Sequence, residues 1–149
     1  HKLKQEALSK KDNLKKYEIK FGEIDVDIYA EYYSKLTIPV EDLKNFVSKI
    51  ESFDVASKEA LLILKQGAEI ERGNSLKGEK DKIDIISLLF FSDLNLKEYY
   101  LILKKYSLEH YLERLISIIK NFKDYNSLNL TPREFKLKKQ KIVESLKKI

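Results

Sequence analysis

The 149-residue sequence contains no cysteine, no methionine and no tryptophan, and it has only four glycines and two prolines. Without cysteine, the chain has no disulfide framework and no thiolate for nucleophilic chemistry or metal binding. It has no run of 18 apolar residues, so we expect no membrane-spanning helix. The first residues, His1 to Lys4, lack the apolar segment of a signal peptide. These absences favour a cytoplasmic protein.

Charge is the property that this sequence has in abundance, since 36% of its residues are charged and 43% are apolar. The apolar fraction can build one hydrophobic core, and the length fits a single domain over residues 1–149. A high charged fraction without cysteine or methionine is typical of heat-adapted proteins. Because initiator methionine is not normally removed before a residue as large as His1, we expect this domain to be the C-terminal part of a longer protein, or to begin with a tag residue.

The net charge of +5 is concentrated at the C-terminal end. Residues 133–149 contain seven Lys or Arg and two Glu, a net charge equal to that of the whole chain, so the remainder is neutral. Thr131 and Glu134 have the spacing of a capping box, with proline at the first helical position, which predicts a helix here. The basic helix from Arg133 to Lys148 could bind an RNA backbone; the alternative is an ordinary solvated helix face.

Two segments near the N-terminus alternate between apolar and polar residues on either side of Gly22. Residues 16–21 and 24–32 therefore predict the strands of a β-hairpin, with the glycine in the turn. Because successive side chains of a strand point to opposite faces, the second strand has an apolar face and a polar face. The apolar face carries Ile24, Val26 and Ile28, and the polar face carries Asp25, Asp27 and Tyr29. A single hairpin is marginal in water, so it must pack on the helices or pair with further strands.

The rest of the chain has the apolar spacing and the capping residues of helices. The predicted fold class is α+β and mostly α, with a short β-hairpin near the N-terminus followed by a bundle of five to six helices. In this division, residues 1–35 are the remnant of a sheet and residues 36–149 are helical. Gly73 would end one helix and Ser107 would cap another. The expected helices cover about 41–51, 55–71, 79–91, 95–105, 107–122 and the segment after Thr131, with a further short one within 2–16.

Residues 61–89 carry the most informative pattern. It is LLxLKxxAxxxRG, followed after a short loop by KDxxDIxxLL. This block resembles the C-terminal helical half of minimal nucleotidyltransferase-fold proteins, the group that includes the AbiEii-type toxins. The resemblance extends over roughly residues 17–95. The residues that carry it are Leu62, Lys65, Ala68, Arg72, Gly73, Lys80, Asp81, Asp84, Ile85, Leu88 and Leu89.

The resemblance implies Mg²⁺-dependent transfer of a nucleotide monophosphate from an NTP to an acceptor, which can be tRNA in AbiEii-type relatives. In that family, two metal ligands lie in a Gly-Ser…Asp-x-Asp motif, and a third carboxylate lies on a following strand. Asp25 and Asp27 match the following strand, so they would be the catalytic carboxylates that bind the metal. No such Gly-Ser motif precedes them, so we expect this chain alone to be inactive. The alternative for both residues is the polar face of a half-exposed strand.

Lys65 and Arg72 lie seven residues apart, close to two helical turns, and project from one helix face. The resemblance implies that both bind nucleotide phosphates, and that Asp81 and Asp84 on the next helix hold these cations or face the same cleft. It also implies that Lys80 supports the nucleotide site from the same helix. The alternatives are ordinary. The two cations could pair with the intervening glutamate on the helix surface, and the acids could lie in the first helical turn because the helix dipole favours them there.

The sequence therefore leaves two classes of function open. The first is part of a nucleotidyltransferase-like enzyme with NTP as ligand and Mg²⁺ as cofactor. The second is a non-catalytic helical module that binds proteins or RNA, which would account directly for the missing motif. Apolar residues on 96–122 could serve an oligomer interface as easily as the core.

Overall fold

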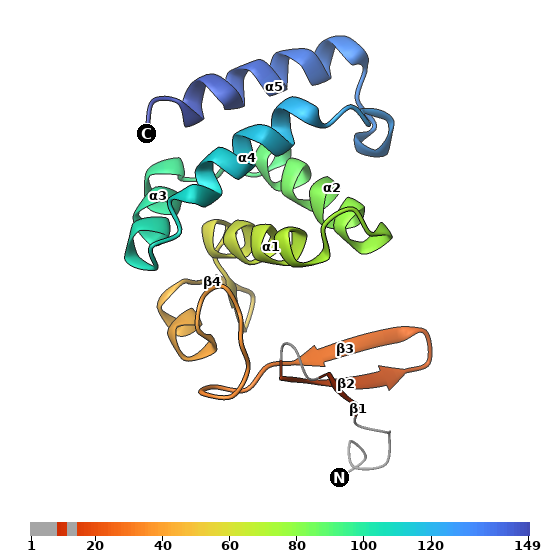
Figure 1. Cartoon of the computed structure of the whole chain (residues 1–149), viewed down its shortest axis with the longest axis vertical. Helices are drawn as coiled ribbons and strands as arrows, with labels where there is room; N and C mark the ends of the chain where they lie inside the picture. The colour runs from red at the N-terminus through yellow and green to blue at the C-terminus, as the bar shows by residue number, and fades with distance from the viewer. Residues whose placement is uncertain (1–8, 12–14) are drawn as a thin grey trace.

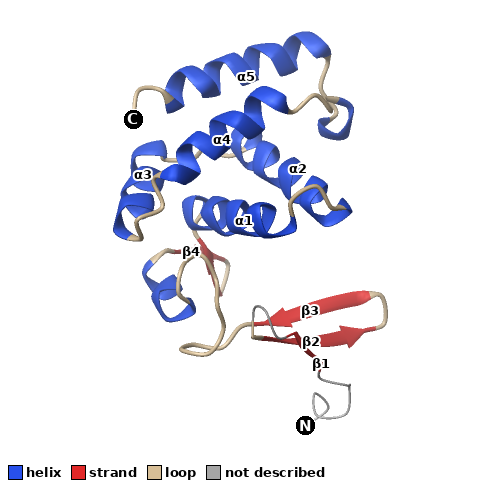
Figure 2. Ribbon diagram, viewed as in Figure 1, coloured by secondary structure: helices blue, strands red, loops and turns tan. Residues whose placement is uncertain are grey.

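The computed structural model describes residues 9–11 and 15–149. This part of the chain is α+β and mostly helical, with the strands before residue 57 and the α-helices after it (Figure 1, Figure 2). The predicted fold class is therefore confirmed. The strands are β1 (Ser9–Lys11), β2 (Lys16–Phe21), β3 (Ile24–Ile28), β4 (Val47–Ile50) and β5 (Phe53–Ala56). The helices are α1 (Lys58–Arg72), α2 (Leu76–Phe91), α3 (Leu96–Lys105), α4 (His110–Asn121) and α5 (Pro132–Leu146), with the short 3-10 segments η2 (Val40–Asn45) and η3 (Asn126–Leu128).

The predicted hairpin at Gly22 is present. β2 and β3 pair antiparallel, with Phe21 opposite Ile24 and Tyr17 opposite Ile28. Gly22 has a φ of 60°, a left-handed conformation that glycine adopts without steric cost. β1 adds a third antiparallel strand beside β2. The apolar face of β3 is exposed to solvent, since Ile24 is 65% exposed.

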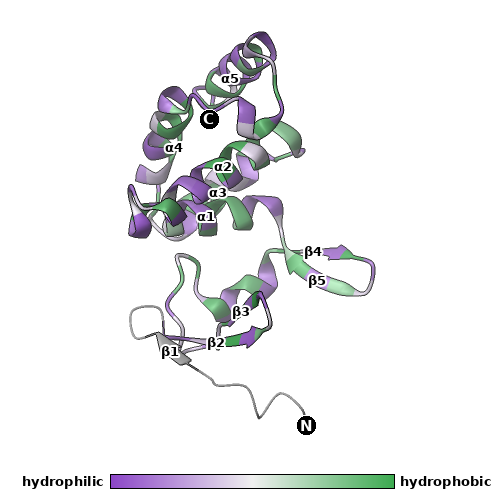
Figure 3. Cartoon of the chain, turned by 90° about the vertical axis from the view of Figure 1, so that its right-hand side faces the viewer, coloured by the Kyte–Doolittle hydropathy of each residue, from purple (hydrophilic) through white to green (hydrophobic). Residues whose placement is uncertain are grey.

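The helix predicted at 41–51 is wrong. The chain instead forms η2 and then a second hairpin, in which Val47 of β4 lies opposite Ala56 of β5 and Ile50 lies opposite Phe53. The apolar residues of this segment fit the spacing of a helix, but many of them are β-branched or aromatic and favour strands. The hairpin projects from the side of the molecule (Figure 3), so the part of the chain predicted to be entirely helical contains a second small sheet.

Other predicted boundaries also change. The short helix predicted within 2–16 falls mostly outside the described residues, and Ser9–Lys11, which are described, form a strand instead. Ser107 does not cap a helix, because it has a φ of 56° and α4 begins after Glu109. α2 begins a few residues earlier than expected, because the Ser75 hydroxyl caps its first turn.

The helices form a bundle around one core, and α1 lies between the other helices and the strands (Figure 1). α1 packs on α2, α3 and α4, while α5 lies beside α4 at the end of the molecule opposite the strands (Figure 1). The predicted capping box is confirmed, since the Thr131 hydroxyl accepts from the N–H of Glu134 and the Glu134 carboxylate accepts from the N–H of Thr131. Apolar side chains with no exposed surface include Ile38, Leu62, Ile63, Ile85, Ile86, Tyr99, Leu103, Leu115 and Ile119.

Candidate functional site

A cleft of about 340 Å³ opens on the side of α1 nearest the first hairpin. Its walls come from four parts of the chain: the end of β3, the connecting segment 35–37, one face of α1 and a buried side chain of α2. We call it the α1 cleft. Its charged lining residues are the cations Lys35, Lys65 and Arg72 and the acids Asp27, Glu71 and Asp81.

Gly67 allows the connecting segment to approach α1. A Cβ at this position would lie 1.8 Å from Oγ1 of Thr37, so a larger residue would clash with the Thr37 side chain. Glycine in a helix interior costs about 0.5–1 kcal/mol relative to alanine, and this close contact accounts for its presence. The approach brings Lys35 and Thr37 into the wall of the α1 cleft. Sequence reasoning missed this wall, and the only signal for it was a glycine inside a predicted helix.

Four of the charged residues predicted on α1 and α2 form one ion-pair network. Arg72 Nη1 donates to Asp81 Oδ2 over 2.8 Å, and Lys65 Nζ donates to Asp84 Oδ2 over 2.6 Å. Lys65 Nζ also lies 3.7 Å from Asp81 Oδ1. The Asp81 side chain is 3% exposed, whereas those of Lys65 and Arg72 are 33% and 34% exposed. A buried carboxylate thus holds two cations that line the cleft.

Asp27 is the predicted metal-binding carboxylate that reaches the α1 cleft. Its Oδ2 accepts a hydrogen bond from Lys16 Nζ over 2.5 Å, and Lys16 also pairs with Glu18 at 3.0 Å. Burial lowers the pKa of Lys16, but the hydrogen bonds to Asp27 and Glu18, together with the nearby charges of Tyr29 and Asp27, raise the pKa above its usual value. Burial also raises the pKa of the neighbouring Tyr29. Asp27 therefore has a lysine partner within its own sheet.

Two predicted site residues lie outside the cleft. Asp25 shares a strand face with Asp27, but its side chain is 69% exposed and pairs with Lys20 at 3.9 Å. Lys80 is exposed on α2 and does not line the cleft. Asp84 lies beside the cleft and is connected to it through Lys65. The predicted residues that the structure brings together at the cleft are Asp27, Lys65, Arg72 and Asp81.

The described side chains do not by themselves fit the Mg²⁺ site that the resemblance implies. Over residues 9–11 and 15–149, no group of three or more His, Asp or Glu side chains is placed to hold a metal ion. The two predicted carboxylates at the cleft are already paired with cations, Asp27 with Lys16 and Asp81 with Arg72. A metal ion here would need further ligands.

An ion pair between a buried carboxylate of α1 and an arginine of α4 was also missed. Glu69 lies between Lys65 and Arg72 in the sequence, but it is fully buried and accepts from Arg114 of α4 through both carboxylate oxygens, at 2.5 and 3.0 Å. The hydrogen bonds to Glu69 raise the pKa of Arg114. Glu69 is therefore not the surface partner of the two cleft cations. Nothing in the sequence marks Arg114 as its partner, because the pairing depends on how α4 packs against α1.

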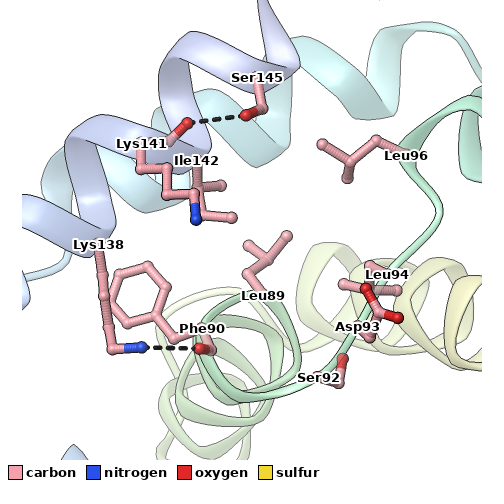
Figure 4. A pocket seen from close by; sticks show the side chains of 10 residues that line it. All are labelled: Leu89, Phe90, Ser92, Asp93, Leu94, Leu96, Lys138, Lys141, Ile142 and Ser145. Atoms are coloured by element: carbon pink, nitrogen blue, oxygen red, sulfur yellow. Dashed lines mark hydrogen bonds between the residues drawn. The ribbon is translucent and has the colours of Figure 1, made fainter.

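Two lysines of the basic helix α5 donate hydrogen bonds to backbone carbonyls of other helices and their ends. Lys138 donates to the carbonyl of Phe90 beside a second hollow, of about 290 Å³, between α2 and α5 (Figure 4). Lys139 donates to the carbonyls of Lys120 and Phe122 near the end of α4, and burial lowers the pKa of Lys139. This second hollow contains none of the predicted site residues. The basic residues of the C-terminal segment that are exposed are Arg133, Lys136, Lys141, Lys147 and Lys148.

Most large apolar side chains on 96–122 face the core. Tyr99, Leu103 and Leu115 are fully buried, and within this fully described segment Leu101, at 64%, is the one large apolar side chain that is exposed. Core packing therefore accounts for the apolar pattern. None of the helices in the described part of the chain combines the length and the apolar character that a membrane span requires.

Comparison with known proteins gave no match, whether to a protein-family model, to a curated protein or to a solved structure. The interpretation of function therefore depends on the residues and the geometry of the α1 cleft.

Proposed function

We propose that the α1 cleft binds the phosphate groups of a nucleotide, and that this chain is the phosphate-binding part of a nucleotidyltransferase-like protein. One observation carries the proposal: Asp27 from β3, Lys65 and Arg72 from α1 and Asp81 from α2 line a single cleft. These residues come from separate elements, and their sequence pattern does not require them to meet. They are also residues that the resemblance to nucleotidyltransferases singles out.

The cations of the cleft suit phosphate groups. Arginine presents a planar fork that can bind two oxygens, while lysine places a mobile point charge against a single oxygen. The bond to Asp81 uses one of the five N–H donors of Arg72, which leaves donors for a ligand. Lys35 adds an exposed cation from the connecting segment. The volume of about 340 Å³ is within the usual range of small-molecule sites.

The reaction that we propose for the complete protein is transfer of a nucleotide monophosphate from an NTP to an acceptor. The described residues do not complete a site for Mg²⁺, so metal ligands would come from outside them. What this chain contributes is binding and orientation of the triphosphate by Lys65 and Arg72, with Asp81 fixing the position of the guanidinium.

Titration of ATP and GTP onto the 149-residue protein by isothermal calorimetry, with and without Mg²⁺, tests the proposal. A hydrogen bond to a charged group contributes about 1.5–3 kcal/mol, so Lys65→Met and Arg72→Gln should each weaken binding about tenfold or more. Lys35→Met should also weaken binding, with the least effect on the fold, because Lys35 is exposed and forms no ion pair with the described residues.

Lys80→Met is the matched control. It removes one positive charge from α2 outside the cleft and should leave the affinity within about twofold of wild type. Melting curves followed by circular dichroism establish that each variant is folded. The proposal is contradicted if wild type shows no saturable binding, or if all four variants bind nucleotide equally well.

RNA binding by α5 is a second candidate, which is favoured by the exposure of Arg133, Lys136, Lys141, Lys147 and Lys148. Each neutralised phosphate releases counterions, so five contacts predict a slope of about −3.5 in a plot of log K against log salt for single-stranded RNA. Changing Lys136 and Lys141 to Gln should reduce that slope by about 1.4. Lys138→Gln is a control for charge alone, because Lys138 is engaged with Phe90. A slope near zero in wild type would rule out this role for α5.

A further inference from the structure

We infer that Asp81 and Asp84, although both contact Lys65, have opposite roles at the α1 cleft. Asp81 positions the cations toward a bound anion, whereas Asp84 holds the Lys65 ammonium outside the cleft until an anion displaces it. This inference rests on the proposed phosphate binding and adds to it a side chain that competes with the ligand.

The two carboxylates differ in burial and in their partners. Asp81 is 3% exposed and contacts both Arg72, at 2.8 Å, and Lys65, at 3.7 Å. Asp84 is 49% exposed, and among the described residues its ion pair is with Lys65 alone, at 2.6 Å. Breaking the contacts of a buried carboxylate leaves an uncompensated charge and is strongly unfavourable. An ion pair between exposed groups contributes little to stability, so a ligand can replace it at small cost.

Lys65 stands between two hollows. It lines the α1 cleft together with Asp81, and it also lines a shallower depression that contains Asp84 and Phe91. Its Nζ lies closer to Asp84 than to Asp81, so the ammonium is directed toward the depression. The lysine side chain is a flexible four-carbon stem, and rotation about its bonds can carry the ammonium into the cleft while α1 stays in place.

An anion in the α1 cleft therefore competes with Asp84 for the same ammonium group. Removing the charge of Asp84 releases Lys65 and should increase the affinity for phosphate. Removing the charge of Asp81 leaves Arg72 without its buried partner and should decrease the affinity. If both acids simply repelled an anionic ligand, neutralising either one would increase the affinity, so opposite changes in affinity are not expected from repulsion alone.

Calorimetric titration of inorganic triphosphate onto the full 149-residue protein, without added divalent cation, measures both effects. Asp84→Asn should tighten binding about two- to fivefold, which corresponds to about 0.4–1 kcal/mol. Asp81→Asn should weaken binding about tenfold or more. Because Asp84 is half exposed, Asp84→Asn should fold normally, so the inference remains testable even if Asp81→Asn does not fold.

Two controls separate displacement of Lys65 from a general change in charge. Glu79→Gln removes one negative charge from the same helix, at a residue that pairs with Lys82 outside the cleft, and should change the affinity less than Asp84→Asn does. In a Lys65→Met background, Asp84→Asn should have no effect, since its partner is absent. Likewise, Asp81→Asn should add nothing once both Lys65→Met and Arg72→Gln are present.

The outcomes distinguish the two proposals. Suppose that wild type binds triphosphate, but the affinity of Asp84→Asn is unchanged, lower than that of wild type, or no different from that of Glu79→Gln. The role of Asp84 is then refuted and phosphate binding stands. Persistence of the Asp84→Asn effect in the Lys65→Met background also refutes it. If neither wild type nor any variant binds triphosphate, both proposals fail.

Discussion

The helical bundle and the strands that precede it are held together by different interactions. Bundle residues such as Ile86 and Leu103 have no exposed surface, whereas Ile24 in β3 is 65% exposed and Phe53 in β5 is 68% exposed. The exposed apolar side chains of the two hairpins therefore contribute little hydrophobic stabilisation, because that term scales with the apolar area removed from water. Ile19 of β2, which is 5% exposed, is an exception in the first hairpin.

The first hairpin is held together by its backbone ladder and by ionic and aromatic contacts. Lys16 pairs with Asp27 and Glu18, and the Tyr17 and Tyr33 rings stack with centroids 5.8 Å apart.

The α1 cleft lies at the junction of the two regions, so part of its wall belongs to the packed bundle and part to β3 and the connecting segment 35–37. Two of the cations proposed to bind phosphate, Lys65 and Arg72, are on the packed wall, where α1 fixes the positions of their backbones.

The largest expected change in the free energy of unfolding tests whether apolar side chains stabilise the bundle more than the strands. Ile86→Ala removes a fully buried side chain and should lower the free energy of unfolding by about 2–5 kcal/mol, because it leaves a cavity in the core. The same substitution at Ile24 should change it by less than about 0.5 kcal/mol. Urea denaturation followed by circular dichroism measures both. A loss at Ile24 comparable to that at Ile86 would mean that β3 belongs to the core after all.

A somewhat smaller effect is expected from the ion pair between Arg114 and the buried Glu69 in the bundle. Arg114→Met leaves the fully buried carboxylate of Glu69 without its bidentate partner. Such a loss typically costs about 3–5 kcal/mol, and we expect about 3 kcal/mol because the Arg114 side chain is 42% exposed and water can replace part of the contact. The same chemical change at the exposed Arg133 should be nearly neutral. If the two variants unfold at the same urea concentration, the pair does not stabilise the bundle.

The parts of the fold that the sequence predicted correctly are those fixed by local chemistry. Gly22 marks the turn between two alternating segments, and Thr131 with Glu134 marks the start of α5; both signals need no knowledge of the rest of the chain. The second hairpin, over 47–56, was missed because the same apolar spacing fits a helix and a strand, and the outcome depends on tertiary packing. The predicted helix start at Ser107 failed for a related reason, since the capping residue was chosen without knowledge of the turn that precedes α4.

In the candidate site, too, the features set by local sequence were predicted and those set by tertiary packing were not. Helical periodicity correctly placed Lys65 and Arg72 on one face of α1, where both line the cleft. Their pairing with Asp81 followed from the resemblance and not from spacing. The wall formed by 35–37 and the partnership of Glu69 with Arg114 could not be predicted, because each joins segments whose relative position is set by the folded core.

The smallest effect concerns a contact that links the two regions. Tyr106, at the end of α3, donates its hydroxyl hydrogen to Asp42 Oδ2 in η2 over 2.8 Å, and its ring packs edge-on against Phe46. Tyr106→Phe keeps the ring and removes the hydrogen bond, so it should lower the free energy of unfolding by about 1 kcal/mol at pH 7. Hydrogen exchange should show the loss mainly in η2 and β4, and little change in α4 and α5. Uniform loosening of the whole chain would mean that the strands and the bundle unfold as one unit.

The pH dependence identifies the source of that effect. Burial and the bond to Asp42 raise the pKa of Tyr106 from 10.0 to about 12. A raised pKa in the folded state means that the stabilisation is complete below the unfolded pKa of 10.0 and is lost as the pH rises toward 12. The difference between wild type and Tyr106→Phe should therefore be constant from pH 7 to 9 and shrink at pH 11, measured by urea denaturation at each pH. Tyr32→Phe, at an 83% exposed ring, provides the control. A difference near zero at every pH would show that ring packing against Phe46, and not the hydroxyl, connects η2 to the bundle. A difference that stays the same at pH 11 would contradict the raised pKa of Tyr106.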